Sequence, residues 1–327
     1  MKCLCCGKPL DTNSVARQNA GWHHSCIKKF FGTTQLPDID ITQKALQKIV
    51  MANTDKGFTV PGVQKKLSLY LNRGSAAEKP RLTLVNFPKS GYILKPQTEE
   101  YQALPEAEFM IMQMAQATGI KTVPFALLQN PQDGAFAYIT KRIDRKFDKY
   151  GNVAQRYAME DFCQLSERLT ADKYKGSYER CAKIIQNYSS RAGLDLSMLY
   201  QRVLFSFVVG NSDMHLKNFS LIEISEGSMK YLLSDAYDLL PVCIILTNDT
   251  EELALTLNGK KSNLKRKDFE EFAKSCKIHP SAAGKIADNI IKKHAEYIAL
   301  CRDSFMPKVM KRSFEKLLEK RLKILAM

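Results

Sequence analysis

Two features common in exported and membrane-bound proteins are missing from this sequence of 327 residues. No run of eighteen or more apolar residues occurs, so no transmembrane helix is expected. The N-terminus, MKCLCCGKPLD, lacks the apolar segment of a secretory signal. The hydrophobic content of 45% and the charged content of 25% are ordinary for a globular protein with a substantial core. A cytoplasmic location is therefore expected.

The cysteines lack the dense pattern of a disulfide-stabilised scaffold. There are nine in 327 residues, and the five that occur singly are expected to be free thiols. Near the N-terminus, two pairs of residues with two-residue spacing could each offer two side chains to one ion, as a tetrahedral zinc site requires. A structural zinc ion and reduced thiols without metal both stay open, and Cys5 and His24 make the ligand choice ambiguous. The candidate zinc ligands are Cys3, Cys6, His23 and Cys26.

Acidic residues are too few to balance the basic ones, and the formal net charge is +15. Such an excess suggests an acidic partner, such as nucleic acid, nucleotide phosphates or a negatively charged protein surface. Seven Lys and Arg against two Glu occur in residues 307–327. A solvated helix face is the first interpretation of this segment, and a docking surface is the second.

An alternating β-α-β-α order is also absent, which argues against a doubly wound parallel sheet. The patterns instead predict an α+β protein with five strands and one helix, followed by a helical half. That order is typical of a bilobal protein-kinase-like fold, with an N-terminal Cys/His segment over 1–35, an N-lobe over 36–140 and a C-lobe over 141–327. The strands are expected within 66–72, 80–87, 91–96, 121–130 and 134–144, with a hairpin at 219–224 and 229–234. Helices are expected near 41–50, 105–119, 160–169, 178–190, 196–209, 266–277, 281–299 and 306–325.

A nucleotide-binding loop of the GxGxxG type is missing, but phosphate-binding candidates are present. Gly62 lies between two expected strands, where it permits a close backbone approach, and Gln64 and Lys66 follow as hydrogen-bond donors. An ordinary turn between strands is the competing interpretation.

A lysine also lies inside one of the expected strands. Lys95 in YILKP is flanked by apolar residues and must reach either solvent or an anion. Glu106 and Glu108 in the following helix are candidate partners for it, although acidic residues are common at helix N-termini.

The segment GNSDMHLKNFS, residues 210–220, has the spacing of a phosphoryl-transfer loop and is called the 210–220 loop below. Asp213 could act as the base for an acceptor hydroxyl, and Asn218 could bind Mg²⁺ through its amide oxygen. Asp238 follows the expected hairpin and is a second metal-ligand candidate, with Asp235 as a rival. A polar turn that caps the preceding apolar helix is the alternative.

Taken in order, these segments resemble the HipA-like serine/threonine kinases, which are toxins of bacterial toxin–antitoxin modules. The residues that carry the resemblance are GVQKKLSL, YILKP, PEAEF, KRIDR, EDFCQL, GNSDMHLKNFS and AYDLLP. They run in the family's order from about residue 58 to residue 241. The HRD and DFG motifs of ordinary protein kinases are absent.

The resemblance implies an ATP- and Mg²⁺-dependent kinase with assigned site residues. Asp213 would be the catalytic base, and Asn218 and Asp238 would be the magnesium ligands. His215 falls at the family's loop histidine, where orienting the loop and contacting phosphate is the expected role. The remaining nucleotide-binding residues would be Gly62, Gln64 and Lys66 of the nucleotide loop, Lys95, and Lys141 and Ile143 beside the adenine.

The resemblance also implies regulation and partners. Family members autophosphorylate a serine just before the loop glycine, and Thr59 occupies that place here. A phosphate there would add negative charge where ATP phosphates bind. With only about sixty residues before the nucleotide loop, the chain resembles the shorter HipT form, which implies a HipS-like small protein and a HipB-like antitoxin. DNA would be contacted through the antitoxin, and the family's substrates include aminoacyl-tRNA synthetases.

Two other classes of function compete with this interpretation. One is a basic nucleic-acid-binding protein with a zinc-binding N-terminus and an inactive kinase fold. The other is a small-molecule kinase of the aminoglycoside-phosphotransferase type, against which the GVQKK and KRIDR segments argue. Every candidate catalytic position is filled by a competent side chain, which favours the active protein kinase.

Overall fold

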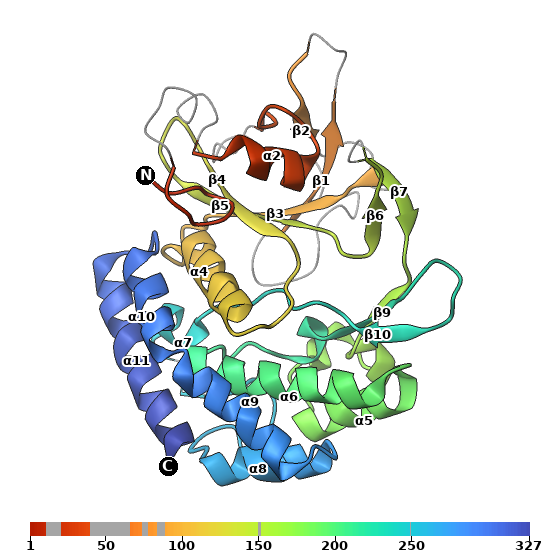
Figure 1. Cartoon of the computed structure of the whole chain (residues 1–327), viewed down its shortest axis with the longest axis vertical. Coiled ribbons are helices and arrows are strands. Elements are labelled where there is room, and N and C mark those ends of the chain that lie inside the picture. The colour runs from red at the N-terminus through yellow and green to blue at the C-terminus, as the bar shows by residue number, and fades with distance from the viewer. Residues whose placement is uncertain (11–20, 40–65, 74–77, 84–88, 150–151, 249) are drawn as a thin grey trace. The chain divides into compact units, whose positions relative to one another are not determined.

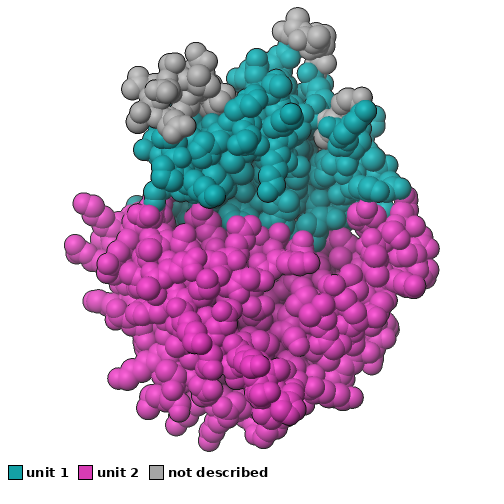
Figure 2. All heavy atoms as spheres, in the orientation of Figure 1, with its two compact units in different colours: residues 1–109, 123–156 teal, residues 110–122, 157–327 magenta. Residues whose placement is uncertain are grey.

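The computed structural model describes the chain except for residues 11–20, 40–65, 74–77, 84–88, 150–151 and 249. The helix predicted near 41–50 therefore lies outside the described residues, as do Thr59, Gly62 and Gln64. The described chain forms two compact units (Figure 2). Unit 1 comprises Met1–Phe109 and Val123–Arg156, and unit 2 comprises Met110–Thr122 and Tyr157–Met327.

Unit 1 is built on a five-stranded sheet in which every pair of neighbouring strands is antiparallel (Figure 1). The strand order is β2-β1-β3-β5-β4, so the central strand β3 pairs with β5, which lies far from it in the chain. All five strands were predicted from the sequence, two of them from the alternation of apolar and polar residues, and the structure confirms them. Their bounds are β1 Leu67–Asn72, β2 Arg81–Thr83, β3 Tyr92–Pro96, β4 Phe125–Gln129 and β5 Phe136–Lys141.

The two faces of this sheet carry different residues. In the register of β3 with β5, Lys95 pairs with Tyr138 and Tyr92 pairs with Lys141. Because successive side chains of a strand point to opposite faces, Lys95 and Tyr138 lie on one face, and Tyr92 and Lys141 lie on the other. Helix α4, Leu104–Ala117, contacts the Lys95 face, and helix α2, His24–Phe31, packs on the Tyr92 face.

A hairpin that was not predicted extends unit 1. Strands β6, Arg145–Phe147, and β7, Val153–Arg156, pair with each other. The Phe147 ring reaches back to Tyr92, with ring centroids 5.7 Å apart, and packs where a side chain on Gly91 would collide with it. For this reason residues 141–156 belong to unit 1, and the boundary expected at residue 140 falls before the hairpin.

Unit 2 is mostly helical and is organised around α6, Ala192–Val209. Residues on every side of α6 are buried, and the helix contacts α5, α8, α9 and α11. By length and composition α6 could cross a membrane, but an apolar helix at the centre of a packed bundle has the same composition. The surrounding helices are α5 Tyr178–Tyr188, α7 Val242–Ile245, α8 Arg266–Ser275, α9 Pro280–Lys292, α10 His294–Asp303 and α11 Lys308–Ala326.

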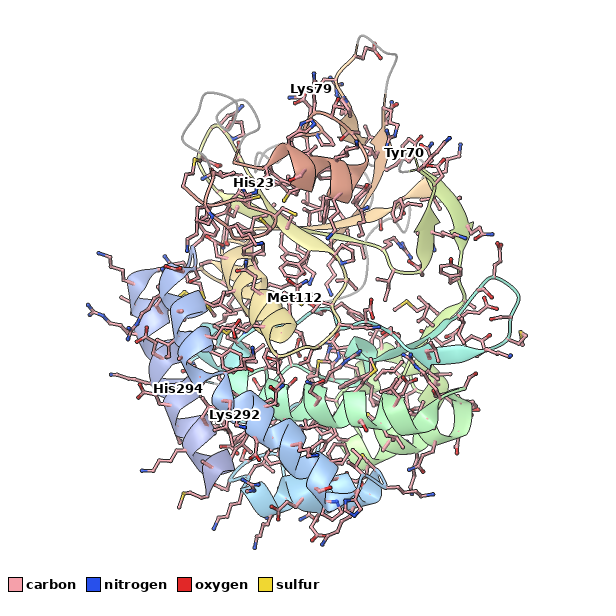
Figure 3. All side chains as sticks on the ribbon, viewed as in Figure 1. His23, Tyr70, Lys79, Met112, Lys292 and His294 are labelled. Atoms are coloured by element: carbon pink, nitrogen blue, oxygen red, sulfur yellow. The ribbon has the colours of Figure 1, made fainter. Side chains whose placement is uncertain are left out.

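The C-terminal half of α4 belongs to unit 2 through hydrogen bonds at its end. The Thr118 and Tyr297 hydroxyls lie 2.6 Å apart, and the amides of Gln201 and Asn289 donate to the Thr118 carbonyl. Exposed polar side chains, such as Lys292, cover the outer side of α9 and α10 (Figure 3).

Two predicted helices are wrong. Residues 159–161 form strand β8, which adds a third strand to the hairpin of β9, Ser220–Glu223, and β10, Tyr231–Leu233. Pairing with β9 overrides the local helical spacing there, and only a short 3₁₀ turn follows at Gln164–Ser166. The helix predicted over 281–299 is two helices, because the backbone of Lys293 departs from helical geometry between α9 and α10.

Candidate active site

The 210–220 loop begins where α6 ends. Gly210 terminates the helix with φ of 70°, a left-handed conformation that glycine adopts without strain, and a side chain there would collide with Leu317. The Asn211 amide donates to the Ser206 carbonyl to complete the cap. The turn therefore does cap the helix, as the simpler interpretation predicted. It also sets the direction in which the chain continues into the polar residues of the 210–220 loop.

Asp213 and Asn218 are joined within this loop. The Asn218 side-chain amide donates to the Asp213 carbonyl over 2.9 Å, and Asn218 closes a short 3₁₀ turn, Leu216–Asn218. This bond commits the NH₂ group to the loop, so that the amide oxygen is the atom that Asn218 can offer to a cation. A carboxylate and an amide oxygen suit Mg²⁺, which prefers hard oxygen ligands.

His215 is buried beside Asp213. Its Nε2 lies 3.9 Å from the nearer Asp213 carboxylate oxygen, and its backbone amide donates to the Asp213 carbonyl over 2.8 Å. Burial lowers the pKa of His215, and neighbouring Asp213 only partly offsets this. Among the described residues, its Nδ1 has no hydrogen-bond partner. A buried, neutral imidazole fits a residue that orients the loop.

Tyr174 is a site residue that the sequence did not single out. Its hydroxyl donates to an Asp213 carboxylate oxygen, and its ring packs edge-on against His215 with centroids 5.0 Å apart. Tyr174 lies 39 residues earlier in the chain, between a 3₁₀ turn and α5, and no motif links it to the loop. Only the folded chain brings this hydroxyl to the carboxylate.

The rival aspartates, Asp235 and Asp238, lie in different environments. Asp235 interacts with the buried guanidinium of Arg202, whose pKa burial lowers to about 10 while Asp235 raises it. Asp238 instead contributes to the electrostatic field at His215. Its φ of 59° is left-handed, a conformation that costs a non-glycine residue energy and is concentrated at functional sites. The two aspartates therefore act electrostatically on different groups, Asp235 on Arg202 and Asp238 on His215.

An ion pair and a tyrosine fix the far end of the loop. Lys217 donates to Asp161 of β8 over 2.7 Å. The Tyr237 hydroxyl donates to the Lys217 carbonyl over 3.1 Å and lies 2.7 Å from the Ser220 hydroxyl. Strand β8 and the residue before Asp238 therefore both hold the loop in one conformation.

In unit 1, Lys95 forms a buried ion pair with Glu108. Their charged atoms are 2.5 Å apart, and the side chains are 5% and 0% exposed. The Lys95 ammonium also lies over the Tyr138 ring, 5.2 Å from its centroid. Of the two glutamates considered from the sequence, the structure selects Glu108, while burial raises the pKa of Glu106.

The other predicted nucleotide residues of unit 1 lie apart from this pair. Lys141 is on the opposite face of the sheet from Lys95, where its ammonium contacts the rings of Phe30 and Phe147 at 5.7 and 4.8 Å. Burial lowers the pKa of Lys141 to about 8. A role for Lys141 beside a nucleotide would therefore fall to its backbone. Ile143 lies in the turn that follows, and Lys66 directly precedes β1.

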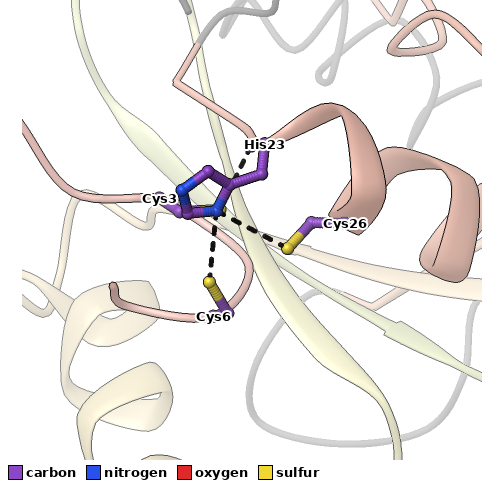
Figure 4. Close-up of side chains that lie close together, drawn as sticks. All are labelled: Cys3, Cys6, His23 and Cys26. Carbon is purple, nitrogen blue, oxygen red and sulfur yellow. Dashed lines mark hydrogen bonds between the residues drawn. The ribbon is translucent and has the colours of Figure 1, made fainter. Parts of the chain in front are cut away.

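The N-terminal cysteines and histidine converge on one point in unit 1 (Figure 4). One potential ligand atom from each of four residues lies within 4.8 Å of the other three, which makes the group compatible with zinc. Cys5 is outside the group, and His24 is exposed on α2. The group, called the Cys/His cluster below, consists of Cys3, Cys6, His23 and Cys26.

Comparison with known proteins gives a consistent result. The model of the HipA-like C-terminal domain family matches residues 58–298. The chain is 27% identical to "Putative kinase Y4mE" of Sinorhizobium fredii, covering 74% of this chain and 56% of that protein. It is 26% identical to a "Putative kinase" of Haemophilus influenzae, covering 92% and 90%. The chain thus spans little more than half of the Sinorhizobium relative.

Two solved structures share the fold. The HipA toxin of Shewanella oneidensis MR-1, solved with HipB and operator DNA, matches 84% of this chain and 70% of its own, with a TM-score of 0.64 and 19% identity. The proinflammatory kinase CtkA of Helicobacter pylori matches 79% and 93%, with a TM-score of 0.53 and 14% identity. At these identities the likeness shows the fold alone, and it confirms the predicted kinase-like fold.

Proposed function

Because this chain belongs to the HipA-like C-terminal domain family, we propose that it is an ATP- and Mg²⁺-dependent protein serine/threonine kinase. The observation that carries the proposal is the buried ion pair between Lys95 and Glu108. A buried pair contributes little net stability, since desolvation offsets the attraction, so its presence calls for a functional reason. In kinases, a strand lysine paired with a helix glutamate holds the nucleotide phosphates.

The residues of unit 2 supply the complementary part of the reaction. Asp213 accepts the proton of the acceptor hydroxyl as that oxygen attacks the γ-phosphorus, and the bond from this phosphorus to the oxygen that bridges to the β-phosphate breaks to release ADP. Asn218 and Asp238 would hold Mg²⁺, which would neutralise negative charge on the phosphate oxygens. His215 packs behind Asp213 and keeps the loop in place. A general base of this kind contributes a rate factor of about 10²–10⁴.

The biological role we propose follows the family resemblance. The chain is a toxin of a HipBST-like module, acts in the cytoplasm and is held by a HipB-like antitoxin and a HipS-like small protein. A complex of HipA with HipB and operator DNA in Shewanella oneidensis supports an antitoxin partner. We expect this chain to contact DNA through that antitoxin. The substrate is a translation-related protein such as an aminoacyl-tRNA synthetase, and Thr59 is the site of autophosphorylation.

Transfer of label from γ-labelled ATP with Mg²⁺ tests this proposal. The acceptors are the chain itself and the proteins of a bacterial extract, and phosphoamino-acid analysis identifies the residue labelled. Asp213→Asn should abolish transfer, whereas Asp172→Asn should leave it unchanged, because Asp172 forms a surface ion pair with Lys175. Label on serine or threonine is expected. No transfer by the wild type would refute the kinase and leave the nucleic-acid-binding function as the better explanation.

A further inference from the structure

The Cys/His cluster has the dimensions of a tetrahedral zinc site. His23 Nδ1 lies 3.4 Å from Cys6 Sγ and 3.8 Å from Cys26 Sγ, and both sulfurs face the same ring nitrogen (Figure 4). Sulfur and nitrogen bound tetrahedrally to one zinc ion, at about 2.3 and 2.0 Å from it, lie about 3.5 Å from each other. We propose that Cys3, Cys6, His23 and Cys26 bind one structural zinc ion that fastens the N-terminal segment to the sheet of unit 1.

The second nitrogen of the histidine supports this assignment. His23 Nε2 lies 3.0 Å from the Pro9 carbonyl oxygen, which can only accept a hydrogen bond. The ring proton is therefore on Nε2, and Nδ1 presents a lone pair to the sulfurs. Metal-binding histidines are commonly oriented in this way, by donation from the ring nitrogen that does not bind the metal.

The backbone around the two proposed ligands Cys3 and Cys6 forms a tight turn. The Gly7 amide donates to the Cys3 carbonyl over 2.9 Å, and Gly7 has a left-handed φ of 72°. The Cys3 amide donates to Lys8, and the His23 amide points at Cys3 Sγ over 3.4 Å. These contacts present both sulfurs on the inside of one turn and direct an N–H dipole toward a thiolate.

The metal site would be closed and structural. All four coordination positions of a tetrahedral ion are taken by protein side chains, which leaves none for a substrate. Cys5 lies between two ligands in sequence but outside the group, and His24 is exposed, so each adjoins a ligand without being one. They provide matched controls.

The cluster fastens two chain segments to the sheet. Leu4 accepts a hydrogen bond from the Leu127 amide of strand β4, and the Trp22 indole donates to the Leu127 carbonyl over 3.2 Å. A segment that bonds to an edge strand in this way covers otherwise unpaired backbone groups. The ligands adjoin both contacts, because Leu4 follows Cys3 and Trp22 precedes His23.

The same cluster positions the aromatic packing behind Lys95. Phe31 of α2 contacts Trp22 and Tyr92, with centroids 5.5 and 5.4 Å away. Tyr92 lies three residues before Lys95 on β3, on the opposite face of the sheet. Zinc would therefore stabilise strand β3, which carries Lys95, from the opposite face of the sheet. Loss of zinc would loosen α2 and expose Trp22.

Metal analysis and cobalt substitution of the full-length chain test the site. We expect one zinc ion per chain and, with Co²⁺, the intense visible bands of a tetrahedral thiolate site. Cys6→Ser should lose the metal and those bands, whereas Cys5→Ser should keep both. His23→Ala and His24→Ala should differ in the same way. Because Cys6 is exposed, its replacement by serine removes no buried packing.

A second readout reports the structural role. The sequence has a single tryptophan, Trp22, and it is fully buried. Chelation should shift its emission to longer wavelength and lower the melting temperature, and added zinc should reverse both changes. A wild-type chain that neither contains zinc nor takes up cobalt would overturn the proposal, as would equal metal loss from Cys5→Ser and Cys6→Ser. Metal loss without a change in Trp22 emission would overturn the fastening role.

Discussion

Replacing Glu108 by glutamine tests the ion pair of unit 1 most sharply. At 2.5 Å and an effective dielectric of about 20, the attraction between Lys95 and Glu108 is about 7 kcal/mol before desolvation is subtracted. Removing one partner of a buried ion pair costs about 3–5 kcal/mol. Glutamine keeps an acceptor oxygen and the side-chain shape, so we expect the lower end of that range, about 3 kcal/mol.

Thermal unfolding measures this cost, and a neighbouring glutamate supplies the control. A loss of about 3 kcal/mol corresponds to a melting temperature lower by about 6–12 °C in a domain of 150–250 residues. Glu106→Gln should change it little, because burial already raises the pKa of Glu106 and disfavours its charge. ATP-dependent transfer should fall in Glu108→Gln and not in Glu106→Gln.

A double variant separates stability from function. The double variant Lys95→Met/Glu108→Leu removes both charges of this pair together, so the melting temperature should recover toward the wild-type value, while activity stays lost. Equal, small shifts for Glu108→Gln and Glu106→Gln would refute the reasoning. So would a double variant no more stable than Glu108→Gln.

Three further predictions concern unit 2. Asp238→Asn should lower Mg²⁺-dependent transfer at least about 100-fold with little change in melting temperature, because asparagine tolerates a left-handed backbone. In the same two assays, Asp235→Asn should lower the melting temperature and leave transfer little changed. The folded-state pKa of His215 is lowered, so its contribution to stability is complete above about pH 6.5 and is lost as the pH falls. Between pH 8 and pH 5 the melting temperature should therefore change less for His215→Gln than for the control His294→Gln, which replaces an exposed histidine. Equal changes in the two variants would contradict this. Tyr174→Phe frees a carboxylate oxygen for the acceptor hydroxyl, so kcat/KM for the protein substrate should rise about fivefold, equivalent to about 1 kcal/mol, and a fall would assign Tyr174 a positioning role instead.

The sequence predicted the elements that have strong local patterns. The alternation of apolar and polar residues in KLSLYLN and the apolar run of α6 each specify one kind of structure, and both elements are present. The predicted helix near 160–169 failed because the partner of β8 lies about sixty residues later in β9, and no local pattern reports such a pairing. The hairpin of β6 and β7 was missed because its strands are mostly polar and exposed.

The site residues show the same difference between features set by local sequence and features set by contacts distant in sequence. Asp213 and Asn218 are five residues apart, so their spacing alone shows that they share a loop. The choice between Glu106 and Glu108 depended on which side chain the fold turns toward Lys95, and Asp235 and Asp238 differ in the charged group that each influences. Tyr174 could not be found from the sequence, because its contacts with Asp213 and His215 arise only after folding.

The most direct test of the account is to measure ATP binding and turnover on the same samples of wild type and Asp213→Asn. Calorimetry gives the Kd for MgATP, and ADP release in the presence of a protein acceptor gives kcat. If Asp213 acts on the acceptor hydroxyl, the Kd should stay within about twofold while kcat falls about 10³-fold. A kcat close to the wild-type value, or a loss of ATP binding as large as the loss of turnover, would contradict the assignment of Asp213 as the base.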